Sequence, residues 1–210
     1  MDGPAIDDQI VALMREYLGT LAGADRFAAE FEALIGTPVV DVPYEEPPFA
    51  FMNDTDWPGL ASTASRALVA AVSDRMGELP WHVPYRSDPS IAGPGFADRA
   101  MSTVRVGPHA PVRAEAFASG IFVMGPDVTY FDHKHEPAEL YLPISGMAEF
   151  WNEDRGWYWA GADDVTIHPS WQWHAMRTGP QPVMIFWAWL GPEGFGTDPV
   201  CRPAMAGEAA

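Results

Sequence analysis

A long series of short β-forming runs limits the fold of this chain more than any other feature. From about Met101 to Leu190, runs rich in branched and aromatic residues are separated by Gly, Pro, Asn and Asp. The runs are Met101–Val106, Arg113–Met124, Glu139–Ile144, Met147–Trp151, Trp157–Trp159, Val165–Ile167 and Val183–Leu190. Ser145-Gly146 and residues 152–156 supply turn signals between them. Many short strands with tight turns favour a β-barrel or sandwich over a βαβ fold.

The first third of the chain has a helical pattern instead. Apolar residues recur with the 3.6-residue spacing of a one-sided helix over residues 6–22. We expect a second helix from Asp25, as its N-cap, to Ile35, and a third from Asp56 to about Leu79. Residues 37–54 contain four prolines and predict an irregular loop. The apolar stripes of these helices are typical of core packing.

The charge balance and the cysteine content exclude several classes of protein. Twenty-nine acidic against twelve basic residues give a formal net charge of −17, so we expect neither nucleic-acid nor membrane-surface binding. No 18 apolar residues run together, which predicts no transmembrane helix. The start MDGPAIDDQI lacks the pattern of a signal peptide, and the lone Cys201 allows no intramolecular disulfide. We therefore expect a soluble, cytoplasmic protein.

The residues that could carry chemistry gather in the segment YFDHKHEPAELY, residues 130–141. His133, His135, Glu139 and Tyr141 have the same parity. Side chains on a strand alternate between its faces, so a continuous strand would direct all four into one interior. Pro137 interrupts this argument, because proline bulges or breaks a strand. Imidazoles and a carboxylate are ligands that a divalent first-row metal accepts.

A fourth ligand has to come from elsewhere in the chain. The best candidate is His174, which ends the strand-like run after Pro169 in the segment IHPSWQWH. His82 and His109 lie outside both segments, and His168 is not among the candidate ligands. We interpret His82, His109 and His168 as ordinary surface or packed histidines.

The two segments together resemble the paired metal-binding motifs of the cupin superfamily. His133, His135, Glu139 and Gly146 match the first motif, and Gly161, Pro169 and His174 match part of the second. Trp171 stands where that family usually has glycine, and Thr178 where it often has asparagine. The resemblance implies a mainly-β fold, a single jelly-roll-like cupin barrel with an N-terminal helical extension. It also implies a helical region 1–90 packed on the barrel, the barrel at 91–195 with the metal site, and a tail at 196–210.

Within the cupins, the chain is most similar to the dimethylsulfoniopropionate (DMSP) lyases. The similarity lies in Tyr130, three residues before HxH, in Tyr141, which ends ExY, and in the segment Trp173–Thr178. It implies base-promoted β-elimination of DMSP to dimethyl sulfide and acrylate. One divalent ion of Fe, Zn, Mn, Ni or Co, held by His133, His135, Glu139 and His174, would bind the substrate carboxylate.

The same resemblance implies a role for each tyrosine. Tyr141 would be the base, and because a free phenol has a pKa near ~10, the metal would have to lower it. Tyr130 would be a second base or a hydrogen-bond donor to the carboxylate. The sulfonium needs aromatic faces, which the alternating pairs Trp157/Trp159, Trp171/Trp173 and Trp187/Trp189 could supply, although barrel-core packing explains any single tryptophan as well.

Three other functions fit the same ligand set. A non-haem iron dioxygenase would use it equally well, as would a related lyase with another small substrate. A cupin that binds a ligand without catalysis is the third. In each case the partner is a small molecule, zwitterionic for a DMSP lyase, and a homodimer would be unsurprising in this fold.

Overall fold

The computed structural model describes residues 6–34, 36–42, 46–58, 62–84, 93–191 and 199–202. The helices are α1 (Ile6–Leu18), α2 (Asp25–Ala33), α3 (Ala50–Asp54), α4 (Thr63–Asp74) and α5 (Phe96–Arg99). The strands are β1 (Ala100–Val106), β2 (Phe117–Met124), β3 (Thr129–Lys134), β4 (Ala138–Ser145), β5 (Met147–Asn152), β6 (Gly156–Gly161), β7 (Thr166–His168), β8 (His174–Arg177), β9 (Val183–Leu190) and β10 (Val200–Cys201).

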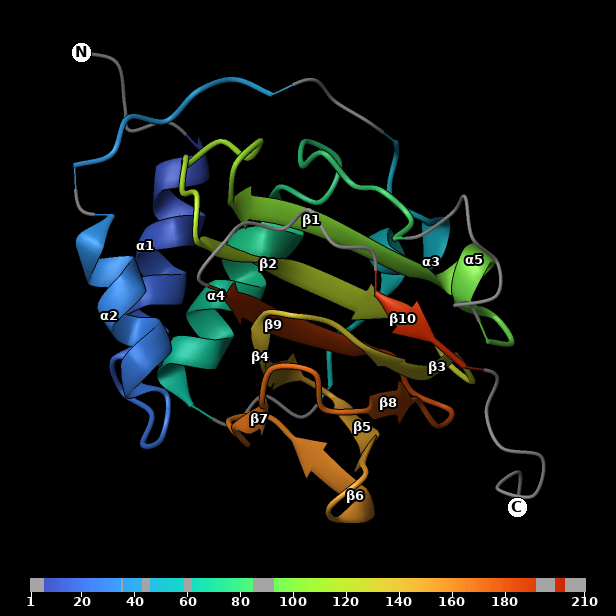
Figure 1. Cartoon of the computed structure of the whole chain (residues 1–210). Helices are drawn as coiled ribbons and strands as arrows, with labels where there is room; N and C mark the ends of the chain where they lie inside the picture. Colours follow the sequence, from blue (N-terminus) through green and yellow to red (C-terminus); the bar gives the residue numbers. More distant parts are fainter. Residues whose placement is uncertain are drawn as a thin grey trace.

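The strands form two five-stranded antiparallel sheets, in the orders β1-β2-β9-β4-β7 and β10-β3-β8-β5-β6 (Figure 1). We call them the helix-side sheet and the open-side sheet, because α1, α2 and α4 lie beside the first (Figure 1). The predicted mainly-β, jelly-roll-like fold with an N-terminal helical extension is thereby confirmed. Among the described strands the pairing gives two facing sheets, as in a jelly roll, rather than one continuous ring.

Two apolar layers hold these parts together. Alternate residues of β4 and β9, among them Leu140, Leu142 and Phe186, pack with α1, α2 and α4 in one cluster. The intervening residues, among them Tyr141 and Ile185, pack between the two sheets in a second cluster. Both faces of the helix-side sheet are therefore covered, which is why all eight residues of β2 are buried. The division of the chain into a helical region, a barrel and a tail at residues 90 and 195 stays a proposal.

A polar contact joins the helices to the β-part. The Tyr17 hydroxyl on α1 donates to Asp163 Oδ1, in the turn between β6 and β7. Ser62 Oγ donates to the same oxygen over 3.2 Å, and Ser62 also caps α4 in a capping box with Ser65. Burial and the adjacent carboxylate raise the pKa of Tyr17, so the phenol stays a donor. This contact fixes α1 and the start of α4 against one end of the β-part.

Of the five described helices, α1, α2 and α4 correspond to the three predicted ones, but several of their ends were predicted wrongly. Ala24, rather than Asp25, precedes the first turn of α2, and the predicted end at Ile35 lies outside the described residues. The third long helix begins after Ser62 and not at Asp56, because the Ser62 capping box sets its first turn. The predicted loop 37–54 contains the short helix α3, whose five residues are too few to show helical periodicity.

One further expectation needs correction at the strands. His174 begins β8 instead of ending a run, because residues 169–173 form a turn and not a strand. In the predicted tail, Val200 and Cys201 form β10 and pair with Lys134 and His133 of β3. The predicted turns are present, with Gly146 at φ 76° between β4 and β5 and Gly156 at φ 76° as the first residue of β6. Among the described helices, none is long and apolar enough to cross a membrane.

Candidate metal centre

Four side chains with ligand atoms meet between the two sheets. One ligand atom from each of His133, His135, Glu139 and His174 lies within 4.8 Å of the other three, and all four residues are buried. These are the four residues that the sequence predicted as a metal set. His133 on β3 and His174 on β8 are directly opposed in register in the open-side sheet. Glu139 comes from β4 of the helix-side sheet, and His135 lies in the connection between β3 and β4.

Hydrogen bonds fix the orientation of the three imidazoles. In each ring Nδ1 faces a backbone carbonyl oxygen: Phe131 at 2.8 Å from His133, Pro137 at 2.9 Å from His135, and Gln172 at 2.9 Å from His174. A carbonyl only accepts, so each Nδ1 carries the proton and each Nε2 presents a lone pair. This is the arrangement by which proteins set the tautomer of metal-binding histidines.

The carboxylate of Glu139 completes the set. Its Oε1 accepts a 2.6 Å hydrogen bond from Trp189 Nε1 on β9. Its Oε2 lies 3.0 Å from His135 Nε2 and 3.0 Å from His174 Nε2. With the Nδ1 atoms protonated, the Nε2 lone pairs of the imidazoles face Oε2 of Glu139, and none of these atoms carries a proton to share. Such a cluster of acceptors is stable only around a cation, either an added proton or a metal ion.

Unpartnered atoms support the same interpretation. The Nε2 atoms of His133 and His174 are buried and have no hydrogen-bond partner among the described residues. Burial lowers the pKa of His133 well below its ordinary value, and His174 and His135 add to this shift. Burial alone would raise the pKa of Glu139, but His135 and His174 outweigh it and hold that pKa well below the usual range. A neutral His133 imidazole and an ionised Glu139 carboxylate are the forms that bind a divalent ion.

Tyr141 and Tyr130 both pack beside the candidate metal centre, from different strands. Tyr141 is buried on β4, with its ring centroid 6.2 Å from that of His174. Tyr130 is buried on β3, and its ring stacks on His133 at 4.0 Å and 19°. Simple alternation would put Tyr130 and His133 on opposite faces. The register shift between them on β3 brings both side chains into the interior. No pattern in the sequence predicted this shift.

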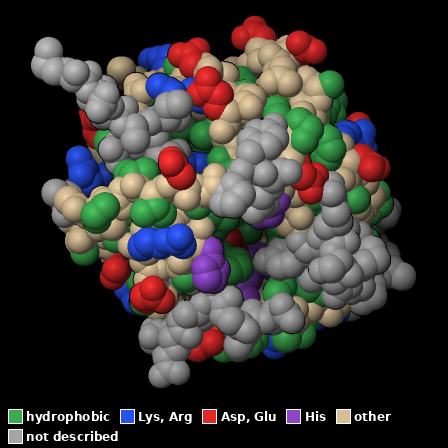
Figure 2. Space-filling view, turned by 90° about the horizontal axis from the view of Figure 1, so that it is seen from above, with side chains coloured by type: hydrophobic (Ala, Val, Ile, Leu, Met, Phe, Trp, Pro, Cys, Tyr) green, Lys and Arg blue, Asp and Glu red, His purple; other side chains and the backbone are tan. Residues whose placement is uncertain are grey.

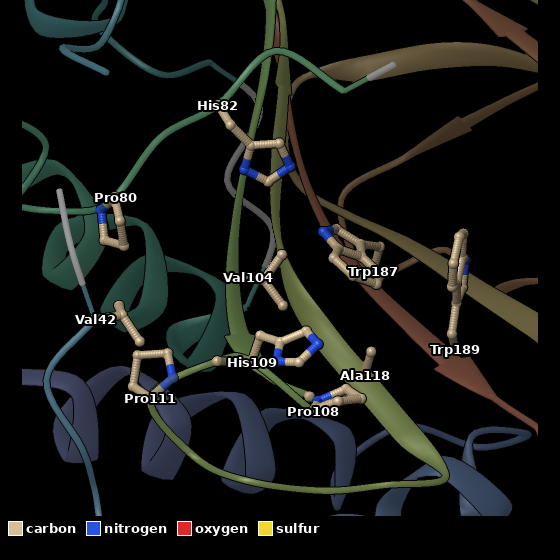
Figure 3. Close-up of a pocket in the computed structure, with 12 residues that line it drawn as sticks. Val42, Pro80, His82, Val104, Pro108, His109, Pro111, Ala118, Trp187 and Trp189 are labelled. Atoms are coloured by element: carbon tan, nitrogen blue, oxygen red, sulfur yellow. The ribbon is translucent and has the colours of Figure 1, made fainter. Parts of the chain in front are cut away.

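The tryptophan pairs differ in their positions. Trp187 and Trp189 project from β9 and line a pocket of about 450 Å3, together with His82 and His109 (Figure 3). Their ring centroids are 5.7 Å apart. Trp157 and Trp173 instead lie under the cationic groups of Arg177 and Arg202, while Trp159 and Trp171 are 53% and 43% exposed. Of the three predicted pairs, the pair on β9 borders both this pocket and Glu139.

The pocket opens on one face of the molecule. Figure 2 shows histidine side chains around a hollow in this face, with apolar side chains inside it. Besides the two histidines, the pocket lining is mostly apolar, with Val104, Pro108 and Ala118 among its residues. An apolar pocket beside a polar, buried cluster is typical of a site for a small molecule. His82 and His109 were expected to be ordinary surface or packed residues, and the structure places both on the wall of this pocket.

His168 is packed in the interior, one of the two alternatives expected for it. It is 1% exposed and stacks on His174. The chain between the two histidines is a turn and not a strand: Trp171 has φ 61°, in the left-handed region. Trp171 thus adopts the conformation that glycine would take at this position, and the turn is retained without the glycine of the cupin motif.

Comparisons with known proteins agree with this architecture. A family model described as dimethylsulfoniopropionate lyase matches residues 45–185. The dimethylsulfoniopropionate lyase DddQ of Ruegeria pomeroyi is 30% identical over 155 residues, which cover 74% of this chain and 75% of that protein. The crystal structure of DddQ from the same organism matches with a TM-score of 0.77 at 24% identity, over 95% of this chain and 98% of the other. A structure described as DMSP lyases RdDddP and RnDddQII also gives a TM-score of 0.77 at 24% identity, covering 96% and 100%.

Proposed function

This chain belongs to the dimethylsulfoniopropionate lyase family and is a lyase that breaks a carbon–sulfur bond; from this we propose that it converts DMSP to dimethyl sulfide and acrylate. The proposed site is the cluster of His133, His135, Glu139 and His174. The observation that carries this proposal is the meeting of three oriented imidazoles and one carboxylate, all buried, within 4.8 Å. A divalent ion of Fe, Zn, Mn, Ni or Co suits these ligands.

The proposed reaction is a β-elimination. A base takes a proton from the carbon next to the substrate carboxylate, and the resulting electron pair forms the C=C bond. The bond between the β-carbon and the sulfonium sulfur breaks, and its electrons leave with dimethyl sulfide. The products are neutral dimethyl sulfide, acrylate and a proton on the base. The metal would supply Lewis-acid stabilisation of negative charge at the carboxylate.

Protein side chains have distinct tasks in this scheme. Tyr141 is the proposed base, because it is buried on the strand that carries Glu139 and packs beside His174. Tyr130, stacked on His133, is the proposed second base or hydrogen-bond donor to the carboxylate. Trp187 and Trp189 offer indole faces to the sulfonium, a contact of ~0.5 to 2 kcal/mol. The mostly apolar lining of their pocket would strengthen such an electrostatic contact.

Headspace detection of dimethyl sulfide tests the proposal. Purified, metal-loaded protein with DMSP should release dimethyl sulfide and acrylate in equal amounts, with or without oxygen. Product release that stops without oxygen would favour a dioxygenase. Binding of DMSP without any product would favour a non-catalytic cupin, and elimination from another small substrate alone would favour a related lyase.

Tyr141→Phe tests the assignment of the base. We expect the variant to keep its fold and its metal content and to lose about 10²- to 10⁴-fold in turnover, the usual contribution of a positioned proton transfer. Tyr158→Phe is the matched control, because Tyr158 lies on β6 under Arg155 and takes no part in the cluster. Wild-type turnover in Tyr141→Phe would remove Tyr141 from this role.

The cytoplasmic location and the homodimer are separate proposals. Cell fractionation would test the first, and light scattering of the purified protein would test the second.

A further inference from the structure

A fourth imidazole packs directly against the candidate metal centre. His168 lies on β7, opposite Glu139 in register, and is 1% exposed. Its ring stacks on that of His174 with centroids 4.2 Å apart and an angle of 10° between the planes. The cluster of converging ligand atoms comprises His133, His135, Glu139 and His174, so His168 contacts a ligand without being part of the set.

Gln172 holds both stacked rings. Its backbone carbonyl accepts from His174 Nδ1 over 2.9 Å, and its side-chain Oε1 accepts from His168 Nδ1 over 3.2 Å. Its side-chain Nε2 donates to Asp154 Oδ2 over 2.7 Å. The same turn is tied to a second ligand, because Trp171 N–H donates to the carbonyl oxygen of His135 over 2.8 Å. One short segment thus anchors a ligand and the ring behind that ligand.

Tyr141 packs against this stacked pair. Its ring meets His168 at 6.0 Å and 71°, and His174 at 6.2 Å and 62°. Both contacts are edge-to-face, so the pair forms a wall for the proposed base. Removal of the His168 ring would open space next to both His174 and Tyr141, since buried rings in a close-packed core hold their neighbours in place.

We infer that His168 and Gln172 are positioning residues that fix the plane of the His174 ring and the place of Tyr141. One hydrogen bond at Nδ1 leaves an imidazole free to tilt about that bond, and the stacked face of His168 removes this freedom. The inference rests on the proposed function, because it concerns the same metal centre. It assigns a role to a histidine that lies outside the four-residue ligand set.

Titration of metal-free protein with Co²⁺ tests this inference independently of turnover. Partners that orient metal ligands typically contribute about 10- to 100-fold to metal affinity. His168→Ala, which removes the stacked ring, should weaken Co²⁺ binding by about 10-fold or more and change the visible absorption of the bound ion. His168→Phe keeps a flat ring in place but cannot bond to Gln172, so its affinity should fall only several-fold, as in Gln172→Ala, with a spectrum close to that of the wild type.

Gln172→Ala tests the role of the hydrogen bond between the Gln172 side chain and His168. It keeps the backbone carbonyl for His174 and loses the anchor of His168, so Co²⁺ affinity should fall several-fold, by less than in His168→Ala. Gln181→Ala, at an exposed glutamine before β9, is the matched control and should bind like the wild type. Because Gln172 is only half-buried, Gln172→Ala can replace His168→Ala as the test if His168→Ala fails to fold.

The outcomes separate this inference from the proposed function. Wild-type affinity and spectrum in His168→Ala, or in Gln172→Ala if His168→Ala does not fold, would overturn the positioning role. Equal losses in His168→Phe and His168→Ala would overturn the role of the stacked ring. Failure of the wild type itself to bind Co²⁺ would instead refute the metal centre, and the inference would fall with it.

Discussion

Replacing Trp189 by Phe should weaken metal binding without disturbing the fold. The change keeps a large aromatic ring on β9 and removes the indole N–H that donates to Glu139 Oε1 over 2.6 Å. Glu139 is 2% exposed, so water does not readily replace this donor. A hydrogen bond to a charged group contributes about 1.5 to 3 kcal/mol, which converts to roughly 10- to 100-fold in affinity. The carboxylate would lose the contact that directs Oε2 toward the imidazoles.

Calorimetric titration of metal-free protein with Co²⁺ would measure this effect. We expect Trp189→Phe to bind about 10- to 100-fold more weakly than the wild type. Trp159→Phe is the matched control, because Trp159 is 53% exposed on β6 and should leave the affinity unchanged. The reasoning would be refuted if Trp189→Phe bound Co²⁺ as tightly as the wild type while far-ultraviolet circular dichroism showed the same fold.

Two other predictions concern stability. Burial, with His174 beside it, lowers the pKa of His168 to about 3, while the unfolded chain protonates this residue near 6.5. The unfolded state therefore binds the extra proton, and metal-free protein should lose about 1.4 kcal/mol per pH unit from this group as the pH falls from 6.5 toward 3. Urea unfolding at several pH values would show a shallower slope in His168→Phe, and equal slopes would contradict the prediction. Tyr17→Phe removes the donor to Asp163 and should lower the free energy of unfolding by about 1.5 kcal/mol in the same assay, whereas an unchanged value would mean that this contact contributes nothing.

The parts of the fold set by local pattern could be predicted from sequence. Val183–Leu190 is observed with the predicted bounds, since a continuous apolar run with turn signals on both sides leaves few alternatives. The shared parity of His133 and His135, and of Glu139 and Tyr141, placed them together although Pro137 separates β3 from β4. Each pair keeps its own alternation, and the proline affects only the connection.

The remaining features depend on contacts that sequence spacing does not encode. The third long helix starts where the capping box of Ser62 places it, and the earlier signal at Asp56 was an equally acceptable start by pattern alone. Tyr130 enters the interior through a register shift in β3. His168 and Trp189 reach the centre through pairing of β4 with β7 and β9, so their roles become visible only once the sheet is assembled.

Metal stoichiometry tests the central claim most directly. The account predicts that metal-free wild-type protein takes up one Co²⁺ per chain and that His135→Ala, which removes one of the four converging ligands, loses this binding while its fold is retained. Binding of one ion per chain by His135→Ala with wild-type affinity, or no binding by the wild type, would contradict it.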